Sequence, residues 1–474
     1  MNARRATFVL GGAAVAVVAM VACADLFDSP SQCQSDRDCT KFGAVCDVTR
    51  AVCVPPGSVT GNEGGFTDGG GSQDATDESP PLPADCNISP KPVAEIVGNP
   101  IDGAGETEIS DLLVDCTKDW SLKTRVFVKA GSTITIQQGV TIRADPNAGL
   151  IIRAGGKIVA QGTRDNPIVF TSSSATPAPG DWTGLFWLGT ASAGATYTTP
   201  DNTFTLPYGG PNSANDDNGT MQFVRVEYAK YSLLLAGLGS ASKIDSVEVR
   251  KVSDDCFDIN GGHFNAKHLI CQYPQDEMWQ IGAGYQGKLQ FLFGQRTPPT
   301  GGGHNGLLVD NNGFPTVYNA TVCGADVGNQ GQGFVFRNNA RFDVNNMIVM
   351  GWNGGMDAVG AVGAPIGLHS SVFFGNVNNP AFAEVEAGTG DLDNDDFGFD
   401  EQAFLLDSGT NGTDDPGLAA CFDPKAPAPW PANAINGGTP PDDGFFDKNA
   451  SYVGAFKDSN DAWAKGAWAK FSDK

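Results

Sequence analysis

Five carboxylates form the densest group of candidate reactive side chains in this sequence. Asp254, Asp255 and Asp258 lie within one short segment, and Asp276 and Glu277 follow the first two by 22 residues. Carboxylates held close together can bind a cation, or can share a proton and act as general acid and base. Asp side chains also cap turns by accepting hydrogen bonds from backbone amides. The sequence leaves all three interpretations open: a metal site, a catalytic centre and a set of turn caps.

The acids belong to a repeat with a period of about 22 residues. The aligned pairs are Asp254 with Asp276, Asp255 with Glu277, Phe257 with Trp279, Ile259 with Ile281, Gly262 with Gly284 and Cys271 with Phe293. Val249 precedes Cys271 by 22 residues, and Val226 precedes Val249 by 23. A fixed period in this range indicates a solenoid, whose units bury their apolar faces on one another. We therefore expect the acids at equivalent positions to stack on neighbouring coils.

Short runs of β-type residues fill the body of the chain, and glycines separate them. The runs are residues 126–128, 134–136, 140–142, 150–152, 158–159 and 168–170. Each run is too short for a helix, and alternation directs about half of its side chains inward. The pattern predicts an all-β solenoid with a central core and a solvated exterior.

Several longer segments carry a family resemblance. They are VFVKAGSTITIQQGVTIRAD, LIIRAGGKIVAQGTRDNPIVFTS, MQFVRVEYA, SDDCFDINGGHFNAKHLI and FFDKNASYVGAF. Over roughly residues 95–471 the chain resembles a family of exported bacterial right-handed parallel β-helix proteins, mostly of unassigned function. The resemblance implies a coil of three sheets and a C-terminal tail that covers the last coil. It carries no established activity.

The string SDDCFDINGG also resembles the Asp-Asp segment of β-helical pectin hydrolases, in which paired carboxylates activate water and protonate the leaving group. In this chain that resemblance implies catalytic roles for Asp254, Asp255 and Asp258. The next coil departs from the hydrolase pattern, because it reads DEMWQ where a Gly-His-Gly is expected, and no Arg-x-Lys follows. An inverting hydrolase would also need its carboxyl groups about 6.5 to 9.5 Å apart.

Calcium is the candidate cofactor, because several carboxylate oxygens in one place suit this cation. Its ligands would be Asp254, Asp255, Asp276 and Glu277. A lyase would need calcium together with an Arg or Lys base. The candidate bases are Arg250, Lys251 and Lys288.

The N-terminus has the features of an export signal. Arg4 and Arg5 precede an apolar stretch over residues 8–21, and the sequence MVAC ending at Cys23 resembles a bacterial lipobox. The resemblance implies a signal peptide over residues 1–22, cleavage before Cys23, and acylation of that cysteine. Ala24 implies sorting to the outer membrane, so we expect a lipid-anchored protein on the outer membrane or surface of a Gram-negative bacterium. An ordinary signal peptide or a short membrane anchor is the alternative.

Cysteines and composition divide the rest of the chain. After a tether over residues 23–32, residues 33–54 hold Cys33, Cys39, Cys46 and Cys53, a spacing that resembles small Cys-rich modules placed after the lipid anchor in secreted myxobacterial proteins. Two disulfides would stabilise so small a segment, and a zinc site is the alternative. Residues 55–85 have the composition of a flexible linker, residues 86–390 are expected to form the β-helix, and residues 391–474 an acidic loop and capping tail.

The remaining cysteines fall within the expected solenoid and its tail. Cys86 and Cys116 are expected to clamp the entrance of the solenoid. The sequence does not pair Cys256, Cys271, Cys323 and Cys421, and small buried thiols are the alternative for Cys256 and Cys271.

Overall charge limits the partners. The 474 residues carry a net charge of −24, which repels nucleic acid. After residue 22 no apolar stretch approaches the ~20 residues of a membrane-spanning helix. The acidic run at residues 391–402 lacks the Gly and Glu of a calcium-binding EF-hand loop. The four histidines form no recognised metal or nucleophile motif.

Aromatic residues could form a sugar-stacking platform if several faced outward, or could fill the core. They are Trp182, Phe186, Trp187, Tyr228, Tyr231, Trp279, Tyr285 and Trp352. We expect a non-enzymatic envelope protein that binds glycan or a partner protein. The alternatives are a polysaccharide hydrolase or lyase and a structural envelope protein. The position of the acids distinguishes these functions: they could lie in an open groove or beneath a loop such as residues 190–220.

Overall fold

A computed structural model describes residues 45–47, 52–54 and 81–470, except 102–104, 211–213, 232, 297–303, 325–330, 377–395 and 424–425. The chain divides into two compact units, residues 1–71 and 72–474. In the first unit, β1 (Val45–Asp47) pairs antiparallel with β2 (Val52–Val54), and the backbone of Cys46 lies opposite that of Cys53. The predicted signal peptide, the predicted acylation site at Cys23, the side chains of the predicted Cys-rich module and most of the predicted linker lie outside the described residues.

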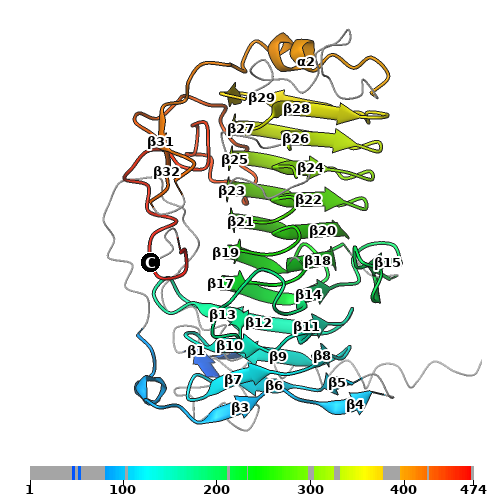
Figure 1. The fold of residues 1–474 in the computed structure, drawn as a ribbon, viewed down its shortest axis with the longest axis vertical. Coiled ribbons are helices and arrows are strands. Elements are labelled where there is room, and N and C mark those ends of the chain that lie inside the picture. Colours follow the sequence, from blue (N-terminus) through cyan, green and yellow to red (C-terminus); the bar gives the residue numbers. More distant parts are fainter. Residues whose placement is uncertain are drawn as a thin grey trace, which may run out of the picture. The chain divides into compact units, whose positions relative to one another are not determined.

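The second unit is a parallel β-solenoid of about 11 turns, with about 24 residues per turn (Figure 1). An 11-stranded sheet contains β4 (Asn99–Ile101), β5 (Glu106–Ile109), β8 (Arg125–Val128), β11 (Gly149–Ile152), β14 (Gly184–Leu188), β18 (Leu233–Leu238), β20 (Phe257–Gly262), β22 (Trp279–Gly282), β24 (Leu307–Val309), β26 (Gln332–Arg337) and β28 (Gly354–Val359). Nearly all its strand pairs are parallel, as the predicted β-helix requires.

A 15-stranded sheet forms the rest of each coil. Its strands are β3 (Val93–Glu95), β6 (Leu112–Val114), β7 (Asp119–Leu122), β9 (Thr133–Ile136), β10 (Thr141–Ala144), β12 (Lys157–Gln161), β13 (Ile168–Ser172), β17 (Gly219–Glu227), β19 (Lys243–Arg250), β21 (Asn265–Gln272), β23 (Lys288–Gln295), β25 (Thr316–Cys323), β27 (Phe342–Met350), β29 (Ile366–His369) and β30 (Val372–Phe374). Strand β17 pairs with β12 before Phe223 and with β13 after it. The long strands therefore bend around a corner, and each coil has three faces.

One residue with a positive φ forms this corner in each long strand. The corner residues are Phe223, Ser246, His268, Phe291, Asn319 and Asn346, with φ between 50° and 61°. Strand pairing skips these positions and resumes on either side of them. The left-handed backbone conformation turns the strand without adding a loop.

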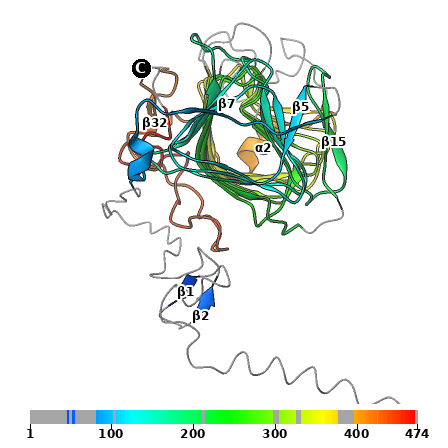
Figure 2. The same ribbon diagram turned by 90° about the horizontal axis from the view of Figure 1, so that it is seen from below.

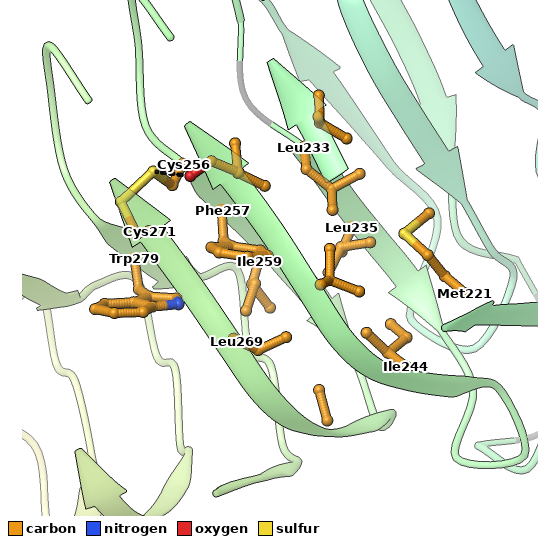
Figure 3. Close-up of a cluster of buried hydrophobic side chains, with 14 of the residues drawn as sticks. Met221, Leu233, Leu235, Ile244, Cys256, Phe257, Ile259, Leu269, Cys271 and Trp279 are labelled. Atoms are coloured by element: carbon orange, nitrogen blue, oxygen red, sulfur yellow. Dashed lines mark hydrogen bonds between the residues drawn. A yellow bond between two sulfur atoms is a disulfide. The ribbon is translucent and has the colours of Figure 1, made fainter. Parts of the chain in front are cut away.

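Stacked apolar side chains fill the interior, and the predicted repeat is largely confirmed (Figure 3). Phe257 pairs with Trp279 and Ile259 with Ile281, and the rings of Phe257 and Trp279 stack 6.2 Å apart. The expected pairing of Cys271 with Phe293 is wrong by one residue, since Cys271 pairs with Gly294. The cause is one extra residue in the later coil: six residues separate Gly282 from Leu289, whereas five separate their partners Asn260 and Ala266.

The tail agrees in part with the one that the resemblance implied. The last coil is covered by α2 (Glu401–Asp407), which Figure 2 shows across the interior of the coil. Residues 418–470, here called the strap, instead run back along the side of the solenoid (Figure 1). The strap includes β31 (Leu418–Ala420) and β32 (Ala428–Pro431), and near its end the Trp468 amide donates to the Arg164 carbonyl.

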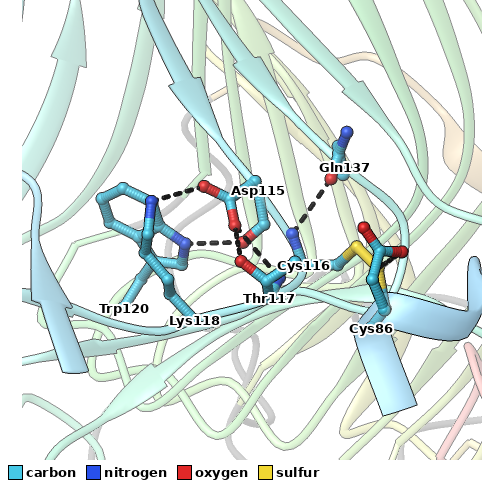
Figure 4. Close-up of a disulfide and its surroundings, with 8 residues drawn as sticks. Cys86, Asp115, Cys116, Thr117, Lys118, Trp120 and Gln137 are labelled. Atoms are coloured by element: carbon cyan, nitrogen blue, oxygen red, sulfur yellow. Dashed lines mark hydrogen bonds and ion pairs between the residues drawn. A yellow bond between two sulfur atoms is a disulfide. The ribbon is translucent and has the colours of Figure 1, made fainter. Parts of the chain in front are cut away.

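Three disulfides lie in the described part of the chain. Cys86 bonds to Cys116 at the first coils, the pair expected there (Figure 4). The other bonds join Cys256 to Cys271 inside the solenoid and Cys323 to Cys421 between β25 and the strap. The alternative of buried thiols at Cys256 and Cys271 is therefore wrong. Among the described helices, none has the length and apolar character that crossing a membrane requires.

Candidate acidic site

The carboxylates occupy the turns that lead into two neighbouring strands of the 11-stranded sheet. Asp254 and Asp255 precede β20, Asp276 and Glu277 precede β22, and Asp258 lies on β20 itself. The Glu277 amide donates to Asp255 Oδ1 at 3.0 Å, and the Cys256 amide donates to the Glu277 carbonyl. Asp255 thus caps the turn of the next coil, as one of the three interpretations expects.

Three of the acids also come close to one another. Oxygens of Asp254, Asp255 and Asp276 lie within 4.8 Å of one another. The exposed fractions are 8% for Asp254, 4% for Asp255, 3% for Asp258 and 8% for Glu277. The Asp276 side chain is 40% exposed. Four of the five acids are therefore buried, and the cluster reaches solvent mainly through Asp276.

Burial and mutual repulsion make these acids hard to ionise. Burial, followed by the charges of Asp258 and Asp276, raises the pKa of Asp254 to about 7. Burial raises the pKa of Asp258 to about 6, and burial with the neighbouring Asp276 raises that of Glu277 to about 8. Burial and Glu277 raise the pKa of Asp255 well above its usual value. A bound cation would relieve this uncompensated negative charge.

A β-hairpin covers part of the sheet surface beside the acids. Its strands β15 (Ala195–Thr198) and β16 (Thr205–Tyr208) pair antiparallel, and their side chains pack on outward residues of the 11-stranded sheet. Burial, together with the charge of Asp258, raises the pKa of both Tyr197 and Tyr208. The acids thus lie partly beneath the 190–220 segment and are not in an open groove.

The next coil adds three polar residues that the sequence analysis did not select. His304 Nδ1 lies 2.9 Å from Asp276 Oδ1, and Asn305 Nδ2 donates to Glu277 Oε1 at 2.8 Å. Arg296 donates to the His304 carbonyl at 2.7 Å. Burial lowers the pKa of Arg296 to about 10, against the opposing effect of Glu277 and Asp276. The negative charges of Glu277 and Asp276 therefore favour the charged form of the buried Arg296.

The three candidate bases named from the sequence make contacts elsewhere. Arg250 is buried in the 15-stranded sheet, with Nε 3.7 Å from Glu248. Lys251 lies 5.9 Å from the ring of Tyr228, and Lys288 forms an ion pair with Asp443 of the strap at 2.5 Å. None of these three contacts involves the acids of the cluster.

Of the two alternatives for the aromatic residues, burial is the one observed. Seven of the eight selected aromatic residues are buried, and Tyr228 alone is partly exposed. Trp182, Trp187, Trp279 and Trp352 fill the core instead.

The acidic run at residues 391–402 is described only from residue 396 onward. Asp396 is buried and accepts a hydrogen bond from the Gly398 amide at 2.8 Å.

The acidic cluster meets the chemical needs of calcium. Asp254, Asp255 and Asp276 offer hard carboxylate oxygens close enough to share one ion, and Glu277 lies beside them. Their raised pKa values mark a charge excess that a divalent cation would offset. Bound calcium would supply positive charge to a carboxylated or hydroxylated ligand at the exposed side of Asp276.

Residues 105–414 match the pectate-lyase-like β-helix domain. The chain belongs to this family. The match spans the acidic cluster, the β15–β16 hairpin and the α2 cap, and it ends just before the strap. No curated protein and no solved structure matches the chain. The family assignment agrees with the parallel β-solenoid of the second unit.

Proposed function

We propose that this protein is a lipid-anchored β-helix of the cell envelope that binds polysaccharide without cleaving it. Acylated Cys23 would hold it at the outer membrane or cell surface. Membership of the pectate-lyase-like family supports a role with polysaccharides. The observation that carries the non-enzymatic assignment is the burial of Asp254, Asp255 and Asp258. In a hydrolase both carboxyl groups must reach the sugar, and in an inverting hydrolase they must also leave room for a water molecule between them.

Calcium would be the resident ion of the acidic cluster in this proposal. Asp254, Asp255 and Asp276 would hold it between two coils, where it would stabilise the solenoid. The exposed side of Asp276 would let the ion contact acidic groups on a glycan. The ion would also offset the repulsion between a chain of net charge −24 and an anionic polymer.

The test combines three measurements on the mature full-length chain in detergent. Calorimetry with CaCl₂ should show one site, which Asp255→Asn weakens at least tenfold. Asp442→Asn is the matched control, because Asp442 is an exposed acid paired with Lys448. Sedimentation with insoluble polysaccharides should show binding, and a reducing-end assay should show no cleavage. Failure to bind any polysaccharide would favour a purely structural envelope protein.

Polysaccharide cleavage is the second candidate, and one observation favours it. The pKa of Asp254 is near 7, that of Glu277 is near 8, and Arg296 lies beside the acids. Groups with such values can exchange protons at neutral pH. Release of new reducing ends, lost in Asp254→Asn, would replace the binding proposal with a hydrolase or lyase.

A further inference from the structure

A second polar site lies on the early coils, away from the acidic strands. A cavity of about 400 Å³ opens beside the ends of β9 and β12. Its polar lining consists of Thr135, Gln137, Gln138, Gln161 and Thr163. None of its lining residues is ionisable, although the chain as a whole is strongly acidic. The cavity therefore suits an uncharged ligand that forms hydrogen bonds.

Some polar atoms of the cavity lining have hydrogen-bond partners within the protein, and others do not. Gln137 Oε1 accepts from the Cys116 amide at 3.0 Å (Figure 4), and Thr163 Oγ1 accepts from the Asn166 amide at 3.1 Å. These bonds leave the Gln137 amide hydrogens and the Thr163 hydroxyl hydrogen as donors. Gln138 Oε1 is buried, and no group in the described part of the chain donates to it. A buried acceptor without a partner lowers stability, and a donor on a bound ligand would remove that cost.

The side-chain amides of Gln137, Gln161 and Gln222 occupy equivalent positions on successive coils and so form a row that begins at the cavity. Gln161 pairs with Gln222 on the next coil, and Gln137 directly follows Ile136, the partner of Ala160. Neighbouring strands lie about 4.8 Å apart, so the row offers one amide side chain per coil. Gln137 and Gln222 are partly exposed and Gln161 is exposed. An extended polymer lying along the solenoid could contact all three.

The same row already binds an extended chain where the strap covers it. Register carries Gln222 through Asp245 and Lys267 to Gln290. Gln290 is buried, accepts from the Asp447 amide at 2.8 Å and donates to the Asp447 carbonyl at 3.3 Å. The late coils therefore show that this row can grip a polar polymer through paired amide contacts. Among the described residues of the early coils, the amide side chains of this row remain partly or fully exposed.

We propose that the early-coil cavity binds one ring of a neutral polysaccharide whose chain follows the row Gln137, Gln161 and Gln222. Sugar hydroxyls both donate and accept, so they match the orphaned Gln138 oxygen and the spare donors of Gln137 and Thr163. Each sugar ring offers several hydroxyls to these closely spaced groups, whereas a peptide backbone offers one donor and one acceptor per residue. This inference rests on the proposed function, since it names the class and place of the bound glycan.

The experiment uses the mature full-length chain in detergent and isothermal titration calorimetry. The probes are neutral hexasaccharides of β-1,4-glucose, β-1,4-mannose and α-1,4-glucose, with hexagalacturonate as the acidic comparison. At least one neutral probe should bind more tightly than hexagalacturonate. Gln161→Ala and Gln138→Met should each weaken that binding at least tenfold. Gln286→Ala is the control, because Gln286 is an exposed glutamine on a different turn.

The outcomes separate this inference from the proposed function. Glycan binding that survives Gln161→Ala and Gln138→Met but is lost in Asp255→Asn would overturn the inference and keep the proposed function. No binding to any saccharide or insoluble polysaccharide would overturn both. Binding of a synthetic peptide of residues 440–453, sensitive to Gln161→Ala, would overturn the assignment to glycan. Unchanged thermal melting of each variant would show that the fold is intact.

Discussion

Asp255 has two opposing effects on stability at the acidic site. Its Oδ1 accepts the Glu277 amide at 3.0 Å, which holds two coils together. Its charge is buried beside other acids, which opposes folding. Asparagine keeps an acceptor oxygen and removes the charge, whereas leucine removes both.

We therefore expect Asp255→Asn to stabilise the calcium-free protein at pH 8 by about 1–3 kcal/mol. Asp255→Leu should destabilise it, because the Glu277 amide would lose its partner. Thermal melting in EGTA checks both changes. A lower melting temperature for Asp255→Asn would show that the carboxylate charge is already compensated in the free protein.

The raised pKa values also predict how stability varies with pH. The pKa of Asp254 rises from its usual 3.8 to about 7, that of Asp258 to about 6, and that of Glu277 from 4.5 to about 8. The folded state binds these protons more tightly, so stability is greatest below about pH 4 from these groups and falls as pH rises to about 8. We expect calcium to raise the melting temperature strongly at pH 8 and little at pH 5. An equal calcium effect at both pH values would contradict this.

The site was only partly predictable at the residue scale. Asp254, Asp255, Asp276 and Glu277 were found together because the two coils that carry them keep a strict spacing of 22 residues. The next coil is 28 residues long, since Trp279 pairs with Leu307. That irregular length concealed His304 from a search by period.

At the scale of elements, α2 closes the end of the solenoid. Leu405 is fully buried against the core, whereas the adjacent Leu406 is 47% exposed. A parallel β-solenoid needs such a cap to protect its last core layer and its strand edges.

Leu405→Ala should cost about 2–5 kcal/mol, because it opens a cavity beneath the cap. Leu406→Ala is the matched control on the same helix and should change stability by less than about 0.5 kcal/mol. Urea unfolding followed by circular dichroism measures both. Equal effects of the two changes would show that α2 does not pack on the last coil in solution.

The strap depends on the corner residues of the long strands. Asn319 Nδ2 donates to the carbonyl oxygens of Ala450 and Tyr452, at 3.0 and 2.6 Å. Its φ is 58°, so glycine can replace it without backbone strain. We expect Asn319→Gly to loosen the strap and to speed its cleavage by protease several-fold.

Asn312→Gly provides the control for this prediction. Asn312 also has a positive φ, and its side chain bonds to the exposed Asn339 and not to the strap. Limited proteolysis with mass spectrometry should show new cleavage near residue 450 in Asn319→Gly alone. Equal cleavage of both variants would assign the effect to backbone freedom and not to the lost hydrogen bonds.

The elements themselves were largely predictable, because each short apolar run between glycines became a strand. The path of the tail was not. Its contacts with the solenoid use amide side chains such as Gln290, Gln295 and Asn319, which are buried only once the tail is in place. Sequence pattern ranks such residues as surface, so it could not reveal the strap.

At the scale of the whole molecule, the N-terminal unit would link the solenoid to a membrane. The sequence MVAC ending at Cys23 predicts a lipid-modified cysteine, and the second unit contributes no membrane-spanning helix among its described residues. One acyl chain gives reversible binding, whereas several chains at ~0.8 kcal/mol per buried methylene give lasting attachment. Acylation of Cys23, if it occurs as proposed, would therefore decide whether the solenoid stays attached to the membrane or diffuses away.

Replacing Cys23 with Ser should release the protein from the membrane fraction and abolish incorporation of labelled palmitate. Cys33→Ser is the control, since it removes a neighbouring cysteine and leaves the predicted acylation site intact. Phase partition in Triton X-114 should place the native protein and Cys33→Ser with detergent and Cys23→Ser in water. Native protein in the aqueous phase, without label, would show an ordinary signal peptide, and the glycan-binding solenoid would then act as a secreted protein.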